Sequence, residues 1–549
     1  MREHARSSFF VVGEGVLETD DQGEPRTRQP TSAEELRRFR FSRLGPKGPR
    51  TDEDLRVALA TAITDAAAQP DSTVPAGFTY LGQFVDHDLT MDRTETQLGT
   101  DLTVDELVQG RSPALDLDSL YGRGPGDRDD RRFYAEDRVK LKVGTTAAVT
   151  VPDERVNVDL AGFDLPRVGG IGGTAADRRA ALIPDPRNDE NLAVAQTHLA
   201  FIRFHNRVVE QLAITGVGER RLFETAREQV VKHYQWLLRT DFLPRVVDPA
   251  VVEDVFAHGR RFFEAHGHHG GHGGRPTMPV EFAVAAYRIG HSMIRSAYQW
   301  NRVFSGTGPA GVASLLQLFT FSGTSGNFRP GSGLPDLDDP NAAGLERLPT
   351  NWIVDFRRLY DFTEAGRPDL AVPPGAGNVT KRIDSLLVDP LTQLPAGSFG
   401  GRGTEVPAIE RNLAFRNLTR AEMVELASGQ QMAELFGVEP LTAAQILEGD
   451  SGAALADLTE EQRDALVAAT PLWFYALREA ELNGGLLGPV GGRVVVEVFH
   501  RAMEGSRHSI VREPSWRPAL GPDSTTFRMT DLLLFAFEGK LDLLNPLGD

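Results

Sequence analysis

One short stretch of the chain gathers residue types that suit acid–base chemistry. Gln83, Asp86, His87 and Asp88 lie within six positions, among apolar neighbours. On a helix, Gln83 and His87 share one face because they are four residues apart. The two aspartates project to either side of the histidine, each by about 100°. Histidine can accept and return a proton near neutral pH, so His87 is a candidate proton-transfer residue. The alternative is a buried structural histidine beside surface carboxylates.

A second polar run, PRNDEN at positions 186–191, opens a stretch with helical periodicity. Arg187 and Glu190 are three residues apart, about one helical turn. Arginine keeps its charge near neutral pH, so Arg187 can stabilise negative charge that develops during a reaction. The alternative is a helix start whose acidic residues interact with the helix dipole.

Oxygen-bearing groups alternate along a third segment. In an extended loop, Ser112, Asp116 and Asp118 would point to one side, with the carbonyl of Ala114 between them. Calcium binds about six to eight hard oxygens and tolerates irregular geometry. With Asp88 added, the set supplies three carboxylates, a hydroxyl and a carbonyl. We predict a structural calcium ion that ties this loop to the helix of Asp88. The alternative is an exposed acidic turn.

Four strings of the sequence, taken in order, resemble the motifs of the animal-type haem peroxidases of the peroxidase–cyclooxygenase superfamily. The resemblance is to a bacterial member of that family. The strings are GQFVDHD at 82–88, PRNDEN at 186–191, YRIGHS at 287–292 and LAFRNLTR at 413–420. The resemblance covers roughly residues 70–540. It implies a mainly α fold with minor β, in which one large domain, residues 51–549, buries a haem between helices. Residues 1–50 are expected to form an N-terminal arm.

The first two strings imply roles on the peroxide-binding side of the haem. In this family the histidine at the position of His87 takes a proton from the near oxygen of bound peroxide. It returns that proton to the far oxygen, so that the O–O bond breaks heterolytically. The resemblance assigns Gln83 to holding distal water or a small anion, and Arg187 to stabilising the leaving hydroxide. It also implies that Asp86 and Glu190 form esters with the haem.

The last two strings imply roles on the other side of the haem. His291 is expected to be the axial ligand of the iron, and Asn417 to accept a hydrogen bond from its second ring nitrogen. Arg288 and Arg420 are expected to face the haem propionates. Gly290 would let the backbone approach the macrocycle. The loop of Asp118 also resembles the family's calcium loop, although serine is commoner at the position of Asp118. The implied cofactors are therefore haem b and Ca²⁺.

Two departures from family patterns bear on the substrate. The chlorinating member of the family has a methionine after the esterified glutamate, whereas this chain has Asn191. We therefore expect bromide, iodide, thiocyanate or phenolic donors rather than chloride. Fatty-acid oxygenases of the superfamily have a radical-forming tyrosine three residues before the axial histidine, where this chain has Arg288. The neighbouring Tyr287 would be out of register by about 100° on a regular helix.

The expected function is a haem peroxidase that reduces hydrogen peroxide and oxidises small anionic or aromatic donors. Two alternatives remain open: a fatty-acid oxygenase of the same superfamily, and a non-catalytic haem-bearing interaction protein. The presence of both His87 and Arg187 disfavours the second alternative, because a carrier would need only His291.

Helices must position these residues. Apolar periodicity predicts a helix that starts after Thr51, where acidic residues crowd the first turn. It predicts further helices over 76–91, 189–212, 222–239, 279–297, 419–436 and 459–481. Period-two alternation over 493–499 is the best strand signal. A Gly/His tract at 266–274 is interpreted as a loop, with soft-metal binding by its histidines as the alternative.

Composition excludes several other classes. The 549 residues carry 59 basic and 77 acidic side chains, a formal net charge of −18, which disfavours nucleic acid and anionic membranes as partners. The absence of cysteine excludes disulfides, zinc–thiolate sites and iron–sulfur clusters. No apolar run is long enough to span a bilayer, and no Sec-type signal core follows Met1. We expect a soluble protein that is cytoplasmic or exported by another route.

Overall fold

The computed structural model describes most of the chain after residue 38. The described ranges are 39–64, 69–94, 96–150, 153–265, 276–320, 322, 346–392, 394 and 407–549, together with strands β1 (Leu17–Thr19) and β2 (Pro25–Thr27). The Gly/His tract and most of the N-terminal arm lie outside the described residues.

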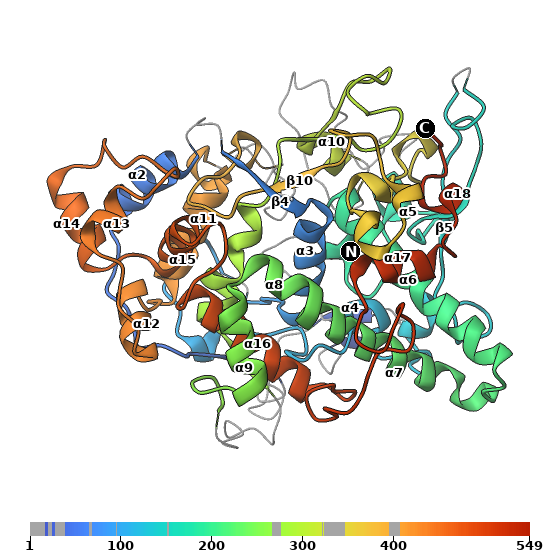
Figure 1. Ribbon diagram of the computed structural model, residues 1–549, viewed down its shortest axis with the longest axis horizontal. Helices are drawn as coiled ribbons and strands as arrows, with labels where there is room; N and C mark the ends of the chain where they lie inside the picture. Colours follow the sequence, from blue (N-terminus) through green and yellow to red (C-terminus); the bar gives the residue numbers. More distant parts are fainter. Residues whose placement is uncertain are drawn as a thin grey trace.

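Helices make up the body of the molecule (Figure 1). The α-helices are α2 (Glu53–Ile63), α3 (Gly77–Leu89), α4 (Asp118–Tyr121), α5 (Ala175–Arg179), α6 (Leu192–Ile214), α7 (Glu219–Leu237), α8 (Leu243–Val246), α9 (Pro249–His258), α10 (Leu315–Thr320), α11 (Leu413–Met423), α12 (Gly429–Phe436), α13 (Ala443–Leu447), α14 (Glu460–Ala468), α15 (Leu472–Leu482), α16 (Gly491–Gly505), α17 (Met529–Ala536) and α18 (Leu541–Leu544). In Figure 1, α3 lies in the middle, with α2 and α11–α15 towards one end and α6, α7 and α17 towards the other. The expected mainly α class is confirmed.

The strands are short, and within the described ranges they pair only in twos. The pairs are β1–β2, β3 (Phe41–Ser42) with β7 (Met278–Pro279), β4 (Asp71–Pro75) with β10 (Val379–Lys381), β5 (Gly144–Thr145) with β6 (Ala161–Asp164), and β8 (Ala297–Tyr298) with β9 (Ala313–Ser314). The β3–β7 pair is parallel and joins residues just before the predicted domain boundary at residue 50 to the body. That boundary stays a prediction.

Several predicted helices are found where expected. Asp52 caps α2, its carboxylate accepting the Leu55 N–H at 2.8 Å. The predicted helix over 76–91 is α3, and the one over 189–212 is α6, whose cap is Asn191. The predicted helices over 419–436 and 459–481 are each interrupted, the second at Pro471, because the residue before a proline disfavours helical backbone.

Two predictions of secondary structure are wrong. Residues 279–297 do not form one regular helix: a π-helical turn, η5 (Glu281–Ala286), is followed by a 3₁₀ turn, η6 (Arg288–His291). The alternation over 493–499 does not form a strand, because these residues belong to α16. Most of this segment is buried, so packing on several sides overrides the strand preference of its valines.

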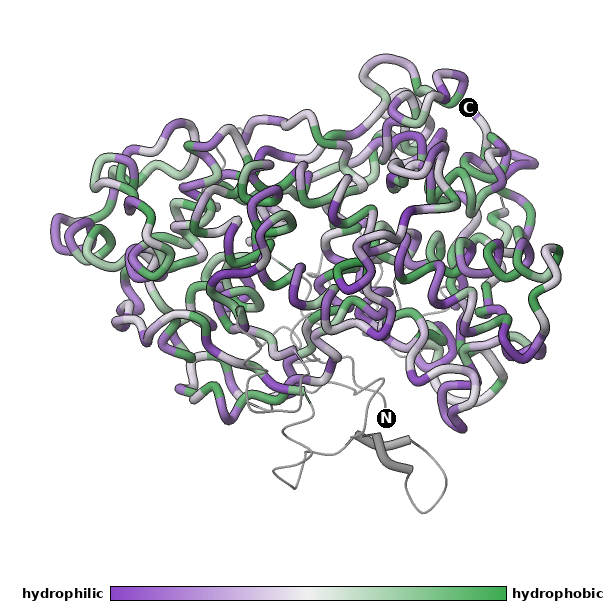
Figure 2. The backbone as a smooth tube through the Cα atoms, turned by 60° about the horizontal axis from the view of Figure 1, so that its bottom comes forward, coloured by the Kyte–Doolittle hydropathy of each residue, from purple (hydrophilic) through white to green (hydrophobic). Residues whose placement is uncertain are grey.

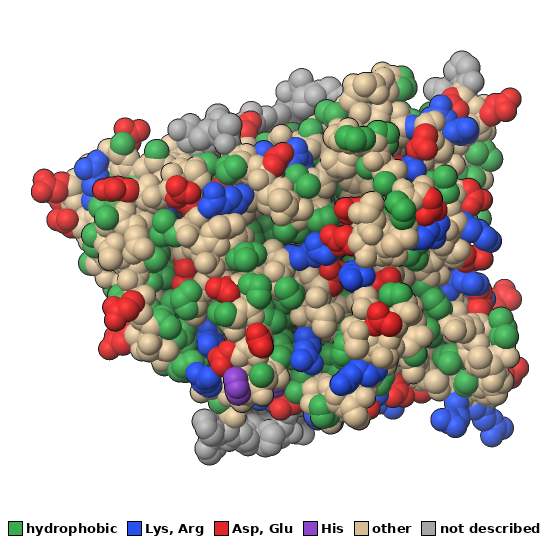
Figure 3. Space-filling model, viewed as in Figure 1, with side chains coloured by type: hydrophobic (Ala, Val, Ile, Leu, Met, Phe, Trp, Pro, Cys, Tyr) green, Lys and Arg blue, Asp and Glu red, His purple; other side chains and the backbone are tan. Residues whose placement is uncertain are grey.

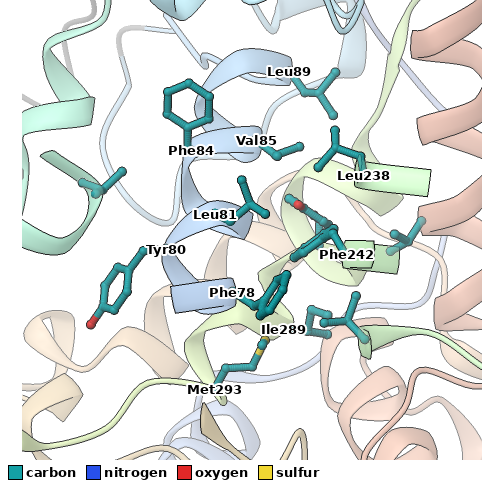
Figure 4. Packing of buried hydrophobic residues seen from close by; sticks show 14 of the residues in the cluster. Phe78, Tyr80, Leu81, Phe84, Val85, Leu89, Leu238, Phe242, Ile289 and Met293 are labelled. Carbon is teal, nitrogen blue, oxygen red and sulfur yellow. The ribbon is translucent and has the colours of Figure 1, made fainter. Parts of the chain in front are cut away.

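Apolar packing holds α3 in place on more than one side. Leu81, Phe84 and Val85 are fully buried. Figure 4 shows side chains of α3 projecting from both sides of the helix, with Leu238 and Phe242 beside one of them. Phe84 stacks on Phe201 of α6, with ring centroids 4.6 Å apart. Burying each such side chain contributes roughly 1.5–3 kcal/mol. The polar face of α3, which carries Gln83 and His87, is thereby fixed in orientation.

Polar and apolar stretches alternate along the backbone in Figure 2, as expected for amphipathic helices packed around a core. On the face seen in Figure 3, acidic and basic side chains are interspersed rather than separated by sign. No helix in the described ranges has both the length and the apolar character needed to cross a bilayer.

Candidate functional site

The predicted site residues from distant parts of the sequence line one cavity. Its volume is about 230 Å³. Helix α3, the 3₁₀ turn η3 (Pro186–Asp189) with the residues that follow it, the η5–η6 segment and α11 all contribute to its wall. The predicted residues in this wall are Gln83, Asp86, His87, Arg187, Glu190, Arg288, Gly290, His291 and Arg420. The cavity therefore joins the two histidines that the sequence assigns to opposite sides of one group.

His87 is held as a neutral imidazole. Its side chain is buried, and its Nδ1 lies 2.8 Å from Oδ1 of Asn188. Burial, followed by the positive charge of Arg187, lowers the pKa of His87 to about 4. The ring is therefore uncharged near neutral pH and has a second nitrogen, Nε2, with which to accept a proton.

Arg187 is fixed by a carboxylate that the sequence analysis did not single out. Its Nε and Nη2 donate to the two oxygens of Asp185 at 3.1 and 2.7 Å, and Nη2 also donates to the His87 carbonyl at 3.0 Å. Arg111 donates to the same carboxylate at 2.7 Å. Burial by itself would raise the pKa of Asp185, but the two guanidiniums hold it well below its usual value.

Gln83 is bound on both ends of its amide. Its Nε2 donates to Glu190 at 3.0 Å, and its Oε1 accepts from Asn191 at 3.0 Å. Asn191 also caps α6 through its Oδ1. Gln83 therefore connects α3 to the start of α6. Its amide nitrogen and oxygen both have protein partners, whereas the sequence predicted that this side chain holds water or a small anion. The other predicted ester residue, Asp86, accepts from Thr90 at 3.0 Å.

His291 and Asn417 lie side by side, with Nδ2 of the amide 3.0 Å from Nδ1 of the ring. In this orientation the amide donates to the ring. Iron ligation through Nε2 would place the proton on Nδ1, so the amide oxygen would have to face the ring instead. A half-turn of the amide exchanges two atoms of nearly equal size and achieves this.

Two guanidiniums and a glycine give the cavity features that suit a flat, anionic group. Burial, and then the positive charge of Arg288, lower the pKa of Arg420 to about 10. These two cations repel one another, which favours a ligand that brings carboxylates to them. A Cβ added to Gly290 would meet no protein atom within 4 Å. The residues present therefore fit a haem with its two propionates.

Tyr287 also lines the cavity, and its hydroxyl donates to the Gly82 carbonyl at 3.3 Å. The expectation that it would be out of register assumed a regular α-helix over 279–297. That assumption is wrong, because the segment is π-helical and then 3₁₀.

The loop predicted to bind calcium does contact α3. Asp88 is fully buried and accepts from the backbone N–H groups of Leu117 and Ser119 at 3.2 and 3.3 Å. Burial raises its pKa to about 7, and nearby Asp116 adds to this effect. Burial and Asp116 likewise raise the pKa of Asp118. These carboxylates therefore lie close enough to destabilise one another's charge.

The remaining residues predicted to bind calcium differ in their surroundings. Ser112 and Ala114 are buried, Asp118 lies 3.7 Å from Arg227, and Asp116 accepts from Ser506. Among the described residues, no three His, Asp or Glu side chains are grouped as a metal site. The calcium site stays a prediction.

Sequence reasoning missed three buried polar residues behind the distal side of the cavity: Asp185, Asn188 and His198. A signal for Asp185 existed, because an aspartate two residues before Arg187 is typical of a turn that caps a helix start. Asn188 and His198 are ten residues apart, so no local spacing rule pairs them.

Several known proteins are similar in sequence to this chain. The animal haem peroxidase family model matches residues 93–310. Heme peroxidase 2 of Caenorhabditis elegans is 23% identical over 403 residues, which cover 72% of this chain and 47% of that protein. A peroxidase-like protein of Margaritifera margaritifera is 26% identical over 261 residues, covering 40% of this chain and 32% of that protein. The chain thus spans about half or less of the length of these relatives.

Solved structures show the same fold. Peroxidase A from Dictyostelium discoideum has a TM-score of 0.52 at 15% identity and covers 96% of both chains. The fatty acid alpha-dioxygenase of Arabidopsis thaliana has a TM-score of 0.53 at 12% identity and covers 92% of this chain and 78% of that one. The corresponding enzyme of Oryza sativa has a TM-score of 0.51 at 12% identity, covering 92% and 81%. Residues 93–310 of the chain are therefore similar to the animal haem peroxidase family, and the curated relatives are peroxidases or peroxidase-like proteins.

Proposed function

We propose that this protein is a haem-dependent peroxidase that reduces hydrogen peroxide and oxidises small donors. The observation that carries the proposal is the convergence of His87, Arg187 and His291 on one cavity. Bound haem would supply the iron that holds peroxide and the electrons that reduce it. His291 would hold the iron, and Arg288 and Arg420 would bind the propionates.

The chain's own residues perform the proton transfer. His87 is neutral because burial lowers its pKa to about 4, so its Nε2 accepts the proton of peroxide and later returns it to the departing oxygen. Arg187 keeps a positive charge beside the histidine, where negative charge develops as the O–O bond breaks. The Asp185 carboxylate positions that charge.

The finer assignments of the site are part of the proposal. Asp86 and Glu190 both line the cavity, so each can form an ester with the haem. Formation of the second ester would require Gln83 to release the Glu190 carboxylate. Asn191 has no sulfur with which to form a sulfonium bond, which supports bromide, iodide, thiocyanate or phenols as donors rather than chloride. A calcium ion beside Asp88 would neutralise the clustered carboxylates.

The test uses the full chain loaded with haem. Hydrogen peroxide should be consumed when iodide or a phenol is present. His87→Ala should reduce the rate of reaction with peroxide by about 10²- to 10⁴-fold while haem stays bound. His258→Ala is the matched control, because this histidine is exposed and does not line the cavity. Equal rates in the two variants would contradict the proposed role of His87.

A second candidate function is oxygenation of a fatty acid. Two observations favour it: the fold is shared with fatty acid alpha-dioxygenases, and Tyr287 lines the cavity. Incubation of the haem-loaded protein with palmitic acid and oxygen discriminates between the two. Oxygen uptake that depends on palmitic acid and is lost in Tyr287→Phe would favour the oxygenase. If neither activity is found while haem is bound, a haem-bearing interaction protein remains.

A further inference from the structure

We propose that Asn188 is a positioning residue that sets which nitrogen of His87 carries the proton, and that His198 keeps the Asn188 amide in the required orientation. This inference deepens the proposed function and rests on it in one respect, namely that His87 is the residue that accepts the proton of peroxide.

The three side chains form a buried hydrogen-bonded row behind the cavity. Oδ1 of Asn188 lies 2.8 Å from Nδ1 of His87, and its Nδ2 lies 2.9 Å from Nδ1 of His198. Asn188 and His198 are completely buried, and His87 is 5% exposed. Of the three, only His87 lines the cavity. Asn188 and His198 therefore act on the cavity through His87.

The backbone holds Asn188 where this row requires it. Asn188 directly follows Arg187 in η3, and its N–H donates to the Asp185 carbonyl at 3.0 Å. The same short turn thus presents Arg187 to the His87 carbonyl and Asn188 to the His87 ring. His198 is delivered from the other side by α6.

An amide oxygen can only accept a hydrogen bond, so the contact with Oδ1 requires the proton of His87 to be on Nδ1. Nε2 of His87 then has a free lone pair, which is the form that can accept a proton from a ligand in the cavity. The reversed amide would place an N–H beside Nδ1 and force the proton onto Nε2. In that state His87 could not act as a base through Nε2.

With the amide in this orientation, Nδ1 of His198 accepts a hydrogen bond from the Asn188 N–H. An accepting Nδ1 requires a neutral ring with its proton on Nε2. Burial keeps it so, lowering the pKa of His198 to about 3. Its Nε2 is buried and has no hydrogen-bond partner among the described residues, and its ring packs edge-on against Phe84 with centroids 5.7 Å apart. Among the described residues, the hydrogen bond with Asn188 is therefore the polar contact made by the His198 ring.

The experiment reads the tautomer of His87 by ¹⁵N NMR of histidine-labelled full-length protein. Spectra are recorded on the chain as purified and on its haem-loaded ferrous form with carbon monoxide bound, which is diamagnetic. Loss of one set of signals in His87→Gln assigns the ring. In the unmodified protein Nδ1 should show the chemical shift of an N–H and Nε2 that of a bare nitrogen.

Three variants then test the roles. Asn188→Leu and His198→Phe should each move the proton of His87 to Nε2, partly or completely. Each should also slow the reaction of the haem-loaded protein with peroxide by about 10²-fold, the lower end of acid–base effects. The matched control is Asn206→Leu, because Asn206 holds both backbone groups of Leu141 and lies away from the cavity. This control should leave the tautomer of His87 unchanged and the rate of reaction with peroxide within about twofold of that of the unmodified protein.

The outcomes separate this inference from the proposed function. A proton on Nε2 in the unmodified protein overturns the inference even if Asn188→Leu does not fold. An unchanged tautomer in both Asn188→Leu and His198→Phe overturns it as well. If the tautomers behave as expected but the haem-loaded protein does not react with peroxide, the positioning role stands and the proposed peroxidase function fails.

Discussion

Replacing Asp185 by asparagine should weaken both the fold and the reaction with peroxide. The Asp185 carboxylate is completely buried and receives hydrogen bonds from Arg187 and Arg111. The Arg111 side chain is fully buried too, whereas that of Arg187 is 19% exposed. The substitution keeps the shape of the side chain but removes the negative charge between two guanidiniums.

The expected loss of stability follows from this burial. Removing one partner of a buried ion pair costs about 3–5 kcal/mol, because the remaining charge stays in a poorly solvating interior. That is a large share of the roughly 5–15 kcal/mol by which folded proteins are stable. The reaction should slow as well, by about 10²-fold, because Arg187 is less firmly held beside His87.

The assay compares urea unfolding and the rate of reaction with peroxide for Asp185→Asn and Asp159→Asn. Asp159 pairs with Arg347 at 2.9 Å, but both side chains are nearly half exposed, so the control should change little. The pH dependence gives a second check. The pKa of Asp185 is held down, so its ionised form stabilises the fold above pH 3.8, and this contribution is lost as the pH falls below that value. Equal unfolding midpoints for the two variants would refute the reasoning.

Four further predictions concern the cavity and the calcium loop. His291→Ala should abolish the absorption band of bound haem, whereas the exposed His258→Ala should retain it. The rate of reaction with peroxide should be constant from pH 8 down to about 5 and fall as the pH drops through about 4, where His87 becomes protonated; a midpoint near pH 6.5 would show that burial does not control this residue. Gly290→Val should block haem binding with little change in helix content by circular dichroism, since its Cβ would occupy open space in the cavity. Dialysis against a calcium chelator should release about one calcium ion per chain and lower the unfolding temperature, and Asp118→Asn should lessen that drop; a protein free of calcium before dialysis would contradict the site.

The sequence predicts the position of α3 well because the relevant interactions are local. The spacing of Gln83 and His87 specifies one helix face, and apolar residues around them specify the buried sides. The fold class follows from similar periodicity elsewhere. The start of the helix after Thr51 was also recognisable, because acidic residues are concentrated in its first turn.

The parts that sequence reasoning missed depend on contacts between distant segments. Glu281 lies at the start of η5 and accepts the N–H groups of Leu44 and Gly45, which lie far away in the sequence. No periodicity reveals that contact or the irregular turn that accompanies it. The meeting of Asn188 with His87 and His198 similarly depends on how η3 and α6 pack against α3, so it became apparent only in three dimensions.

The two mutually repelling guanidiniums of Arg288 and Arg420 have a consequence for the life of the protein in a cell. A folded chain without an anionic ligand retains this repulsion, and a ligand that binds only the folded state stabilises it in proportion to the logarithm of its concentration. Newly made chains that have not acquired such a ligand should therefore open more often and be degraded faster by proteases. The abundance of the protein would then follow the supply of its cofactor without any dedicated regulator.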